Sequence, residues 1–167
     1  MSVCSSGGHD ELLNGVVMDP FYITPLHASV THQIAEPFFH LPEKTCIVSI
    51  RNPVRLDEYN ELQPDVMLLK RIPNYYSQRH PGPEDVLLLV EVADASLDYD
   101  HEEKLPVYGC AGVSEVWIVN LNELTVEIYR EPNFTGYGSK TILRAGEHAK
   151  PLAFPDVTVD MAEWLKR

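Results

Sequence analysis

The sequence contains no long hydrophobic run. Its longest unbroken aliphatic stretch, Val86 to Val90, is far shorter than the ~18 apolar residues that a membrane-spanning helix needs. The N-terminus also lacks a basic segment followed by an apolar one, which is the pattern of a secretory signal. These absences predict a soluble protein that is not exported, and we expect it to be cytoplasmic and to have no membrane partner.

Cysteine is scarce as well. The three cysteines, Cys4, Cys46 and Cys110, are an odd number, lie far apart and show no CxxC spacing. This pattern argues against a disulfide framework and against a cysteine-based zinc site. We expect structural thiols in a cytosolic chain.

Basic residues are few relative to acidic ones. The chain has 13 Lys and Arg against 25 Asp and Glu, a net charge of −12, which argues against broad attraction to nucleic acid or anionic membranes. The distribution is uneven, however, because residues 44–80 hold six basic residues against four acids, whereas residues 84–131 hold two against twelve. We therefore expect a basic patch on an acidic body, with a modest and salt-sensitive affinity for phosphate.

The length and the apolar patterns indicate a single domain. A chain of 167 residues supports one compact core, which we place at residues 26–167, with residues 1–25 as an N-terminal arm packed on the domain or preceding it. Apolar residues recur every three to four positions over residues 27–38 and predict an amphipathic helix that ends at Pro37 or Pro42.

Short apolar runs predict the strands of a sheet. Val86–Ala93 is apolar on both faces except at Glu91, and a strand of this kind belongs at the centre of a sheet. Residues 98–111 show helical spacing, which Pro106 kinks or starts late, and stop at Gly112. Further strands are expected at residues 45–50, 66–69, 116–119, 125–129 and 139–143, and a short terminal helix within 159–165.

The order strand, helix, strand over residues 86–119 predicts a crossover unit whose two strands pair in parallel. The expected fold class is α/β (α+β), with a mixed central sheet flanked by helices.

Glu91 is the most informative residue, because an ionised carboxylate buried in a core strand needs a partner. Asp65 stands 26 residues earlier at the start of the preceding strand, so neighbouring strands could bring the two carboxylates together. Two such acids repel unless a cation lies between them, and Mg2+ is held by one or two carboxylates with water and substrate phosphate. Alternatively, Glu91 meets water or an arginine at the rim of the sheet, and Asp65 belongs to a Pro-Asp turn.

Lys104 follows Glu91 by 13 residues, on the segment that returns from the carboxyl end of the strand. A helix packed on the sheet could direct its ammonium toward the two acids. Two carboxylates, a cation and a lysine could then perform metal-assisted phosphodiester hydrolysis. The alternative is a solvated helix lysine that pairs with Asp100.

Other candidate residues have simpler explanations. His27 and His32 lie five positions apart on the predicted helix, are poorly placed to share one metal, and are expected to be surface or satisfied histidines. Tyr75 and Tyr76 could stack on a base, although packing within their loop is the simpler interpretation. Trp117 is expected in the core.

Four segments in order resemble the Uma-two family of restriction endonucleases. They are Pro64-Asp65-Val66, the strand DVLLLVEVADAS, the stretch from Tyr99-Asp100 to Lys104-Leu105-Pro106 with Tyr108, and AGVSEVWIVNL. The resemblance extends over about residues 9–159. That family is similar to the PD-(D/E)xK nuclease superfamily, so the resemblance implies a restriction-endonuclease-like fold, a mixed sheet flanked by helices.

The resemblance also implies a Mg2+-dependent nuclease site, with Asp65 and Glu91 as metal ligands and Lys104 as the catalytic lysine. In the broad superfamily the lysine usually stands two residues after the glutamate, and here that position is Ala93. The Uma-two pattern supplies the lysine from the following helix, which is why Lys104 is the candidate. Glu11, in ELLNG, resembles the start of the family, and whether it joins the site stays open.

The leading hypothesis is a metal-dependent endonuclease of the restriction type, which uses Mg2+ or Mn2+ to hydrolyse phosphodiester bonds of nucleic acid, with DNA as the expected polymer. Cutting both strands of a duplex needs two sites, so we expect a homodimer. One alternative is a non-catalytic dimeric interaction module of the same fold, which the negative charge favours and the set of two acids and a lysine opposes. Another is a phosphoesterase acting on a small nucleotide.

Overall fold

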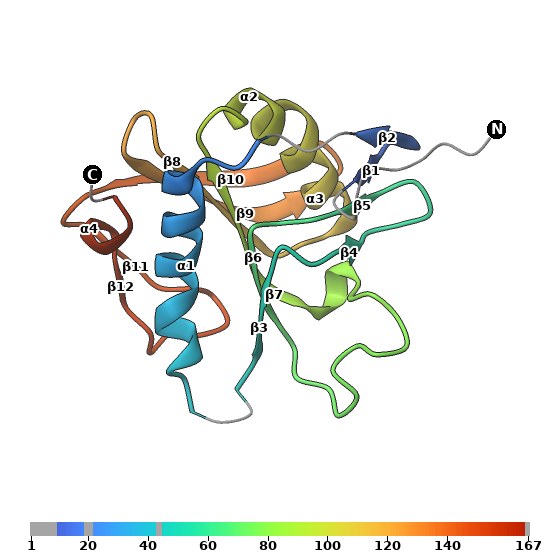
Figure 1. Ribbon diagram of the computed structural model, residues 1–167, viewed down its shortest axis with the longest axis horizontal. Helices are drawn as coiled ribbons and strands as arrows, with labels where there is room; N and C mark the ends of the chain where they lie inside the picture. The colour runs from blue at the N-terminus through green and yellow to red at the C-terminus, as the bar shows by residue number, and fades with distance from the viewer. Residues whose placement is uncertain (1–9, 19–21, 43–44, 166–167) are drawn as a thin grey trace.

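A six-stranded sheet forms the centre of the molecule in the computed structural model, which describes residues 10–18, 22–42 and 45–165 (Figure 1). The strand order is β10-β9-β8-β7-β6-β3. β7 and β8 run parallel, and the remaining neighbours in this sheet run antiparallel. The predicted mixed sheet, with the long apolar strand near its middle and a parallel crossover after it, is therefore confirmed. The strands are β3 (Ile47–Ile50), β6 (Val66–Leu69), β7 (Val86–Ala93), β8 (Glu115–Asn120), β9 (Thr125–Asn133) and β10 (Gly136–Arg144).

Two smaller sheets use very short strands. One has the order β2-β1-β5-β4, and the other pairs β11 with β12. The hairpin of β1 and β2 comes from the N-terminal segment, and Leu12 in β1 pairs with Glu61 in β5. This pairing holds Glu11, the residue before Leu12, beside the β5 segment. The strands are β1 (Glu11–Leu13), β2 (Val16–Met18), β4 (Val54–Arg55), β5 (Glu61–Leu62), β11 (His148–Ala149) and β12 (Val159–Asp160).

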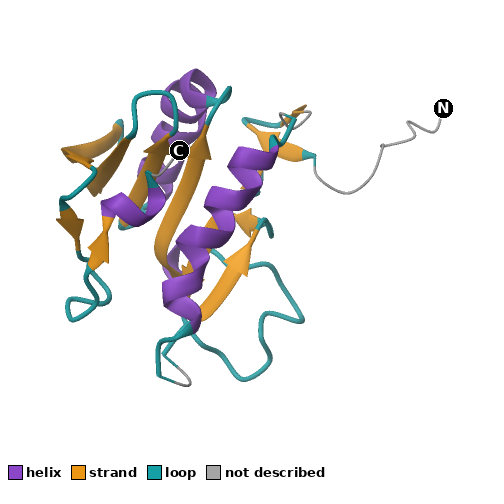
Figure 2. Cartoon of the chain, turned by 60° about the vertical axis from the view of Figure 1, so that its left-hand side comes forward, coloured by secondary structure: helices purple, strands orange, loops and turns teal. Residues whose placement is uncertain are grey.

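The long helix α1 (Pro25–Phe39) lies across one face of the sheet (Figure 2). Thr24 caps its start, because the Thr24 hydroxyl accepts a hydrogen bond of 3.1 Å from the amide of His27. Pro37 is tolerated inside the last turn, and the helix ends at Phe39, between the two prolines expected to terminate it. Its buried face presents Val30, Thr31, Ile34, Ala35 and Phe38.

The helix expected over residues 98–111 consists of three joined segments, α2 (Leu97–Tyr99), the π-helical turn η2 (Asp100–Lys104) and α3 (Leu105–Ala111). Pro106 stands in the first turn of α3, where its missing N–H costs least. Gly112 ends the helix, as predicted, with φ +86° in the left-handed conformation that favours glycine. Two short helices complete the description, η1 (Pro83–Asp85) and α4 (Met161–Trp164).

Alternation along the strands divides the apolar side chains between two cores, one on each face of the sheet. The first core lies under α1 and α4 and contains Trp117, as predicted, with its ring centre 5.7 Å from that of Trp164. The second core lies under α3 and contains Leu89 and Tyr108. None of the helices within the described ranges combines the length and the apolar character of a transmembrane segment.

Candidate active site

Asp65 and Glu91 lie side by side where β6 begins and β7 nears its end. Val66 pairs with Val90 in the antiparallel register, so the residue before β6 lies opposite Glu91. The amide of Asp65 donates to Glu91 Oε2 at 3.3 Å, and the amide of Val92 donates to Asp65 Oδ2 at 2.9 Å. Both side chains are buried. Neighbouring strands thus bring together the two carboxyl groups that the sequence places 26 residues apart.

Lys104 points into this pair of acids. Its Nζ lies 3.0 Å from Glu91 Oε1 and 2.9 Å from Glu11 Oε1, and only 7% of its side chain is exposed. The wide π-helical turn η2 ends at Lys104, and the hydroxyl of Tyr108, one turn later, donates to the same Glu91 Oε1 at 2.7 Å. The alternative of a solvated lysine is wrong. Glu11 joins the cluster directly through Lys104, and its Oε1 also accepts from the amide of Gln63 at 2.8 Å.

Two further residues, His27 and Arg51, hold Asp65. His27 Nε2 lies 3.0 Å from Asp65 Oδ2, and Arg51 Nη1 lies 3.5 Å from Asp65 Oδ1. His27 therefore belongs to the site and is paired through Nε2, whereas His32 is exposed, as expected for a surface histidine. The Nδ1 atom of His27 is buried and has no hydrogen-bond partner among the described residues.

Sequence reasoning did not assign His27 or Arg51 to the site. Arg51 directly follows β3, and Ile50 pairs with Val66, so the pairing of β3 with β6 would have placed Arg51 next to Asp65. That pairing joins segments far apart in the chain, and the alternation of apolar residues does not reveal it. The sequence points to His27 even less clearly. Its contact with Asp65 depends on how the start of α1 packs against the sheet, which no strand pairing predicts.

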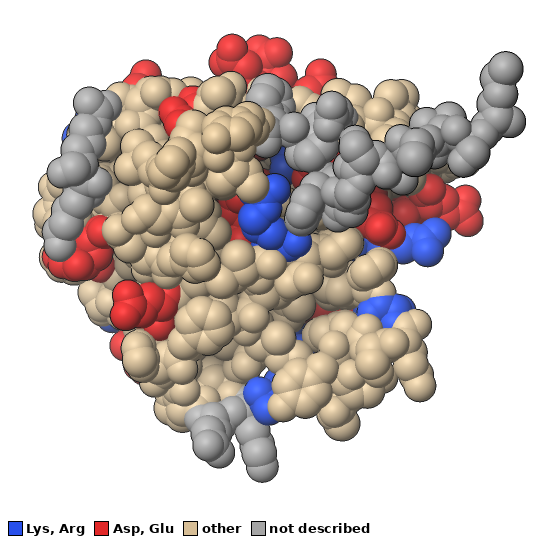
Figure 3. Space-filling view, viewed as in Figure 1, with Lys and Arg blue, Asp and Glu red and all other residues tan. Residues whose placement is uncertain are grey.

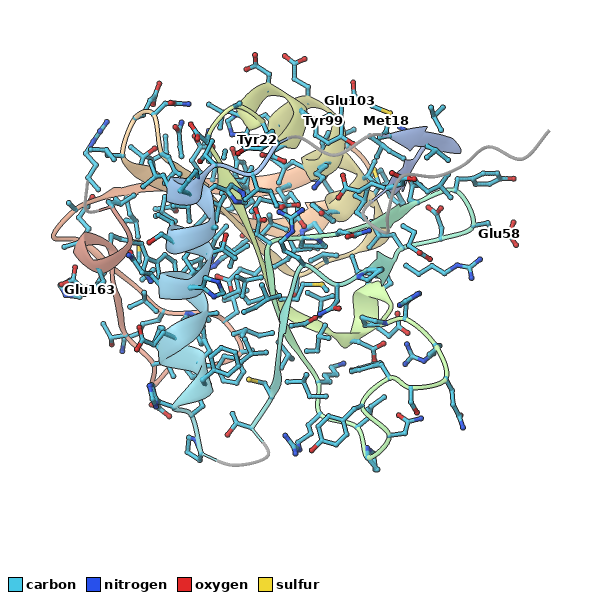
Figure 4. All side chains as sticks on the ribbon, viewed as in Figure 1. Met18, Tyr22, Glu58, Tyr99, Glu103 and Glu163 are labelled. Atoms are coloured by element: carbon cyan, nitrogen blue, oxygen red, sulfur yellow. The ribbon has the colours of Figure 1, made fainter. Side chains whose placement is uncertain are left out.

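A small pocket of about 60 Å³ opens between these groups. Tyr22, just before α1, and Tyr99, at the end of α2, flank it at the upper end of the molecule (Figure 4). Asp100 also lines it and is buried, with the hydroxyl of Ser96 donating to Asp100 Oδ2 at 2.6 Å. The charged and polar lining consists of Glu11, His27, Arg51, Gln63, Asp65, Glu91, Asp94, Ser96, Asp100 and Lys104.

The pocket is short of positive charge. Burial raises the pKa of Glu91 to about 8, which outweighs the opposing effect of Lys104, and neighbouring acids raise it further. Burial likewise raises the pKa of Asp100 to about 6. Burial alone would lower the pKa of Lys104, but the carboxylates of Glu91, Glu11 and Asp100 raise it well above its usual value, so the ammonium stays charged. An additional cation would stabilise the ionised acids.

The donor set fits a hard divalent cation. Among the described residues, no three His, Cys, Asp or Glu side chains are arranged as a ready-made metal site. The carboxylate oxygens of Asp65 and Glu91 are contacted instead by His27, Lys104 and backbone amides. Mg2+ nevertheless needs only one or two protein carboxylates beside water and phosphate. Asp65 and Glu91 supply two such carboxylates at the pocket wall. The pocket has more acidic than basic side chains, so the positive charge of the ion would be balanced there.

Comparisons with known proteins agree with this architecture. The profile of the Uma2 family, described as "Putative restriction endonuclease", matches residues 4–162. The crystal structure of "a putative nuclease belonging to DUF820" from Anabaena variabilis superposes with a TM-score of 0.75 over 93% of this chain and 89% of that chain. The two share 12% identity, so this likeness shows the fold alone. No curated protein matches the chain. Because the family profile spans most of the sequence, the chain belongs to the Uma2 family.

Proposed function

We propose that the protein is a metal-dependent endonuclease that hydrolyses phosphodiester bonds of nucleic acid, with DNA as the polymer and Mg2+ or Mn2+ as the ion. One observation carries the proposal: Asp65 and Glu91 meet at adjacent strands, with the Lys104 ammonium 3.0 Å from Glu91 in the same pocket. Membership of a family of restriction-endonuclease type supports it.

Asp65 and Glu91 are the residues that would hold the ion. When bound, a divalent ion supplies a Lewis acid and makes water a nucleophile near neutral pH. Lys104 would donate a hydrogen bond to an oxygen of the reacting phosphate and stabilise the negative charge that develops there. Its ammonium is fixed in advance by Glu11 and Glu91, so little reorientation is needed during the reaction.

The surrounding residues orient the two proposed ligands. His27 and Arg51 contact different oxygens of Asp65, and the amide of Val92 provides a third contact. Tyr108 fixes Glu91 through Oε1. These contacts keep both carboxylates at the pocket wall, and a rigid supporting shell of this kind is what a metal site requires.

Calorimetric titration of Mn2+ into wild-type protein and Glu91→Gln protein tests the proposal, followed by incubation of both with single- and double-stranded DNA and RNA at low salt. We expect Mn2+ binding and cleavage by the wild type and loss of both in the variant. Glu123→Gln, which removes an exposed carboxylate outside the pocket, is the matched control and should behave as wild type.

The other outcomes separate the alternatives. Mn2+ binding without cleavage of any polymer would contradict endonuclease activity and favour a phosphoesterase that acts on small nucleotides. Absence of Mn2+ binding would contradict a metal enzyme and favour a non-catalytic interaction module.

A further inference from the structure

The loop between β6 and β7 is the most basic exposed segment of this acidic chain. Residues 66–83 form the longest stretch without Asp or Glu, and they contain Lys70, Arg71 and Arg79. Arg55 lies against the same loop, because its amide donates to the carbonyl of Pro81 at 2.9 Å. Lys and Arg side chains lie in the middle and lower right of the face in Figure 3, while most acids lie around its rim.

Two arginine–tyrosine pairs shape this loop. The Arg71 guanidinium lies 4.9 Å from the centre of the Tyr75 ring, and that of Arg79 lies 5.4 Å from the Tyr76 ring. The Tyr76 hydroxyl donates to the carbonyl of Lys70 at 2.6 Å and fastens the loop. The ring of Tyr75 is not packed away, since 59% of the residue is exposed.

The backbone at these tyrosines is strained. Tyr75 and Tyr76 have φ values of 50° and 62°, in the left-handed region that bulky residues rarely occupy. Such conformations are energetically unfavourable and cluster at functional sites. The loop therefore keeps a strained backbone that places the Arg71 guanidinium against an exposed tyrosine ring.

The loop and the pocket lie at opposite ends of β7, so the length of this strand gives the distance between them. Glu91 stands five residues beyond Val86, where the loop enters β7, so the two are about 17 Å apart at ~3.3 Å per residue. Successive phosphates along one strand of a duplex advance by about 3.4 Å, so this span corresponds to roughly five nucleotides. An open groove of about 770 Å³ runs beside the loop, lined in part by Arg55, Tyr76, Arg79 and His80.

We infer that the loop of residues 70–80, together with Arg55, is the docking surface for the phosphate backbone of a nucleic acid, about five nucleotides from the reacting phosphodiester. The inference rests on the proposed function. Lys70, Arg71 and Arg55 contact phosphates, and Tyr75 stacks on an exposed base. A local docking surface explains how a chain of net charge −12 binds a polyanion.

A double substitution, Lys70→Gln with Arg71→Gln, tests the inference. Arg79 is left in place because it neutralises the buried Asp85 at 2.6 Å. The control, Arg144→Gln with Lys150→Gln, changes net charge equally at exposed positions outside the loop. Fluorescence anisotropy measures binding of a 20-base-pair DNA duplex in EDTA across a sodium chloride titration.

We expect the loop variant to bind roughly tenfold more weakly at 50 mM salt, with the slope of log affinity against log salt reduced by about two, while the control stays near wild type. Equal effects in the loop variant and the control would overturn the inference. So would absence of wild-type binding to the duplex, or displacement of the duplex by polyglutamate as readily as by DNA.

A second measurement separates this inference from the proposed function. Bis(4-nitrophenyl) phosphate is too small to reach the loop from the pocket, so its Mn2+-dependent hydrolysis should be the same in the loop variant and the wild type. Loss of this hydrolysis in the loop variant would overturn the inference, because the loop would then act on the pocket itself. Loop-dependent duplex binding in a wild type that hydrolyses nothing would refute the nuclease and leave the docking surface standing.

Discussion

Lys104 is the buried cation on which the acids of the pocket depend. Replacing it with Met keeps most of its apolar stem but leaves Glu91 and Glu11 without their ammonium partner. Removing one member of a buried ion pair typically costs about 3–5 kcal/mol, so Lys104→Met should lower the free energy of unfolding of the metal-free protein by about 3 kcal/mol. Urea denaturation with and without Mn2+ measures the change, and Mn2+ should reduce the deficit by supplying positive charge.

Lys140→Met is the matched control. Lys140 also pairs with a carboxylate, Glu127 Oε2 at 2.9 Å, but 43% of its side chain is exposed, so the expected loss is below about 1 kcal/mol. An equal deficit for Lys104→Met with and without Mn2+ would contradict the expectation that the ion compensates for the missing ammonium.

Glu127, which lies outside the pocket, contributes to the stability of the fold at acidic pH through its contacts with Tyr129, Lys140 and His101. Burial opposes its ionisation, but hydrogen bonds from Tyr129 and Lys140 and the charge of His101 outweigh this and lower its pKa below the usual value. A carboxyl group with a lowered pKa in the folded state stabilises the protein above its unfolded pKa, and this contribution is lost as pH falls through the folded pKa.

We therefore expect thermal denaturation of Glu127→Gln to depend less on pH than that of the wild type between about pH 5 and 3, because the substituted residue no longer titrates. Glu123→Gln, which alters an exposed carboxyl group, should keep the wild-type pH dependence. If thermal denaturation of Glu127→Gln and of the wild type depended on pH identically in the acid range, this role of Glu127 would be contradicted.

At the residue scale, the sequence reveals a site residue when a charged side chain stands in an apolar segment that is expected to be buried. Glu91 interrupts an apolar strand, and that interruption alone singles it out among the 25 acids of the chain. Asp100 and Arg51 give no such signal, because each is an ordinary polar residue in a polar stretch. Their places depend on tertiary packing, namely the π-helical turn that buries Asp100 and the β3–β6 pairing that places Arg51.

At the scale of elements, α3 rests directly on the hairpin of β9 and β10. A Cβ atom at Gly109 would lie 2.1 Å from the carbonyl oxygen of Gly136, a backbone atom that has little freedom to move. Gly109→Ala should therefore push α3 away from β10 and lower the free energy of unfolding by about 2 kcal/mol or more, measured by urea denaturation.

Gly112→Ala is the comparison for this effect. Gly112 has open space for a methyl group but a φ of +86°, so only the conformational cost of about 1 kcal/mol applies. A smaller loss for Gly109→Ala than for Gly112→Ala would contradict the close contact between α3 and the hairpin.

Elements with a clear apolar run or period were predictable, down to the four residues of β6, and the shortest strands were not. The apolar run of β7 and the spacing of α1 carry enough residues to show their period. The strands β1, β2, β4 and β5 have two or three residues each, too few for alternation to stand out. The sequence therefore predicts only an N-terminal arm where the structure has the hairpin of β1 and β2. Because this hairpin brings Glu11 to Lys104, the sequence alone did not decide whether Glu11 joins the site.

At the scale of the whole molecule, cleavage of both strands of a DNA duplex would require two pockets. We expect a homodimer, because one chain carries one set of Asp65, Glu91 and Lys104. Sedimentation equilibrium should then give a mass near twice the 18.9 kDa of the chain. A monomeric mass throughout the working concentration range, together with breaks in both strands, would contradict this expectation.

The π-helical turn η2 makes the chemistry of the fold sensitive to chain length. η2 is bonded from residue i to residue i+5, so a deletion of one residue between Asp100 and Lys104 would tighten it to an α-helical turn and change the positions of these two side chains relative to each other. With α3 held against β10 at Gly109, the deletion would turn Asp100 and the segment before it, or pull Lys104 out of line with Glu91. The loss of a single codon would thus displace one member of the proposed site, either Asp100 or Lys104, with every strand of the sheet unchanged.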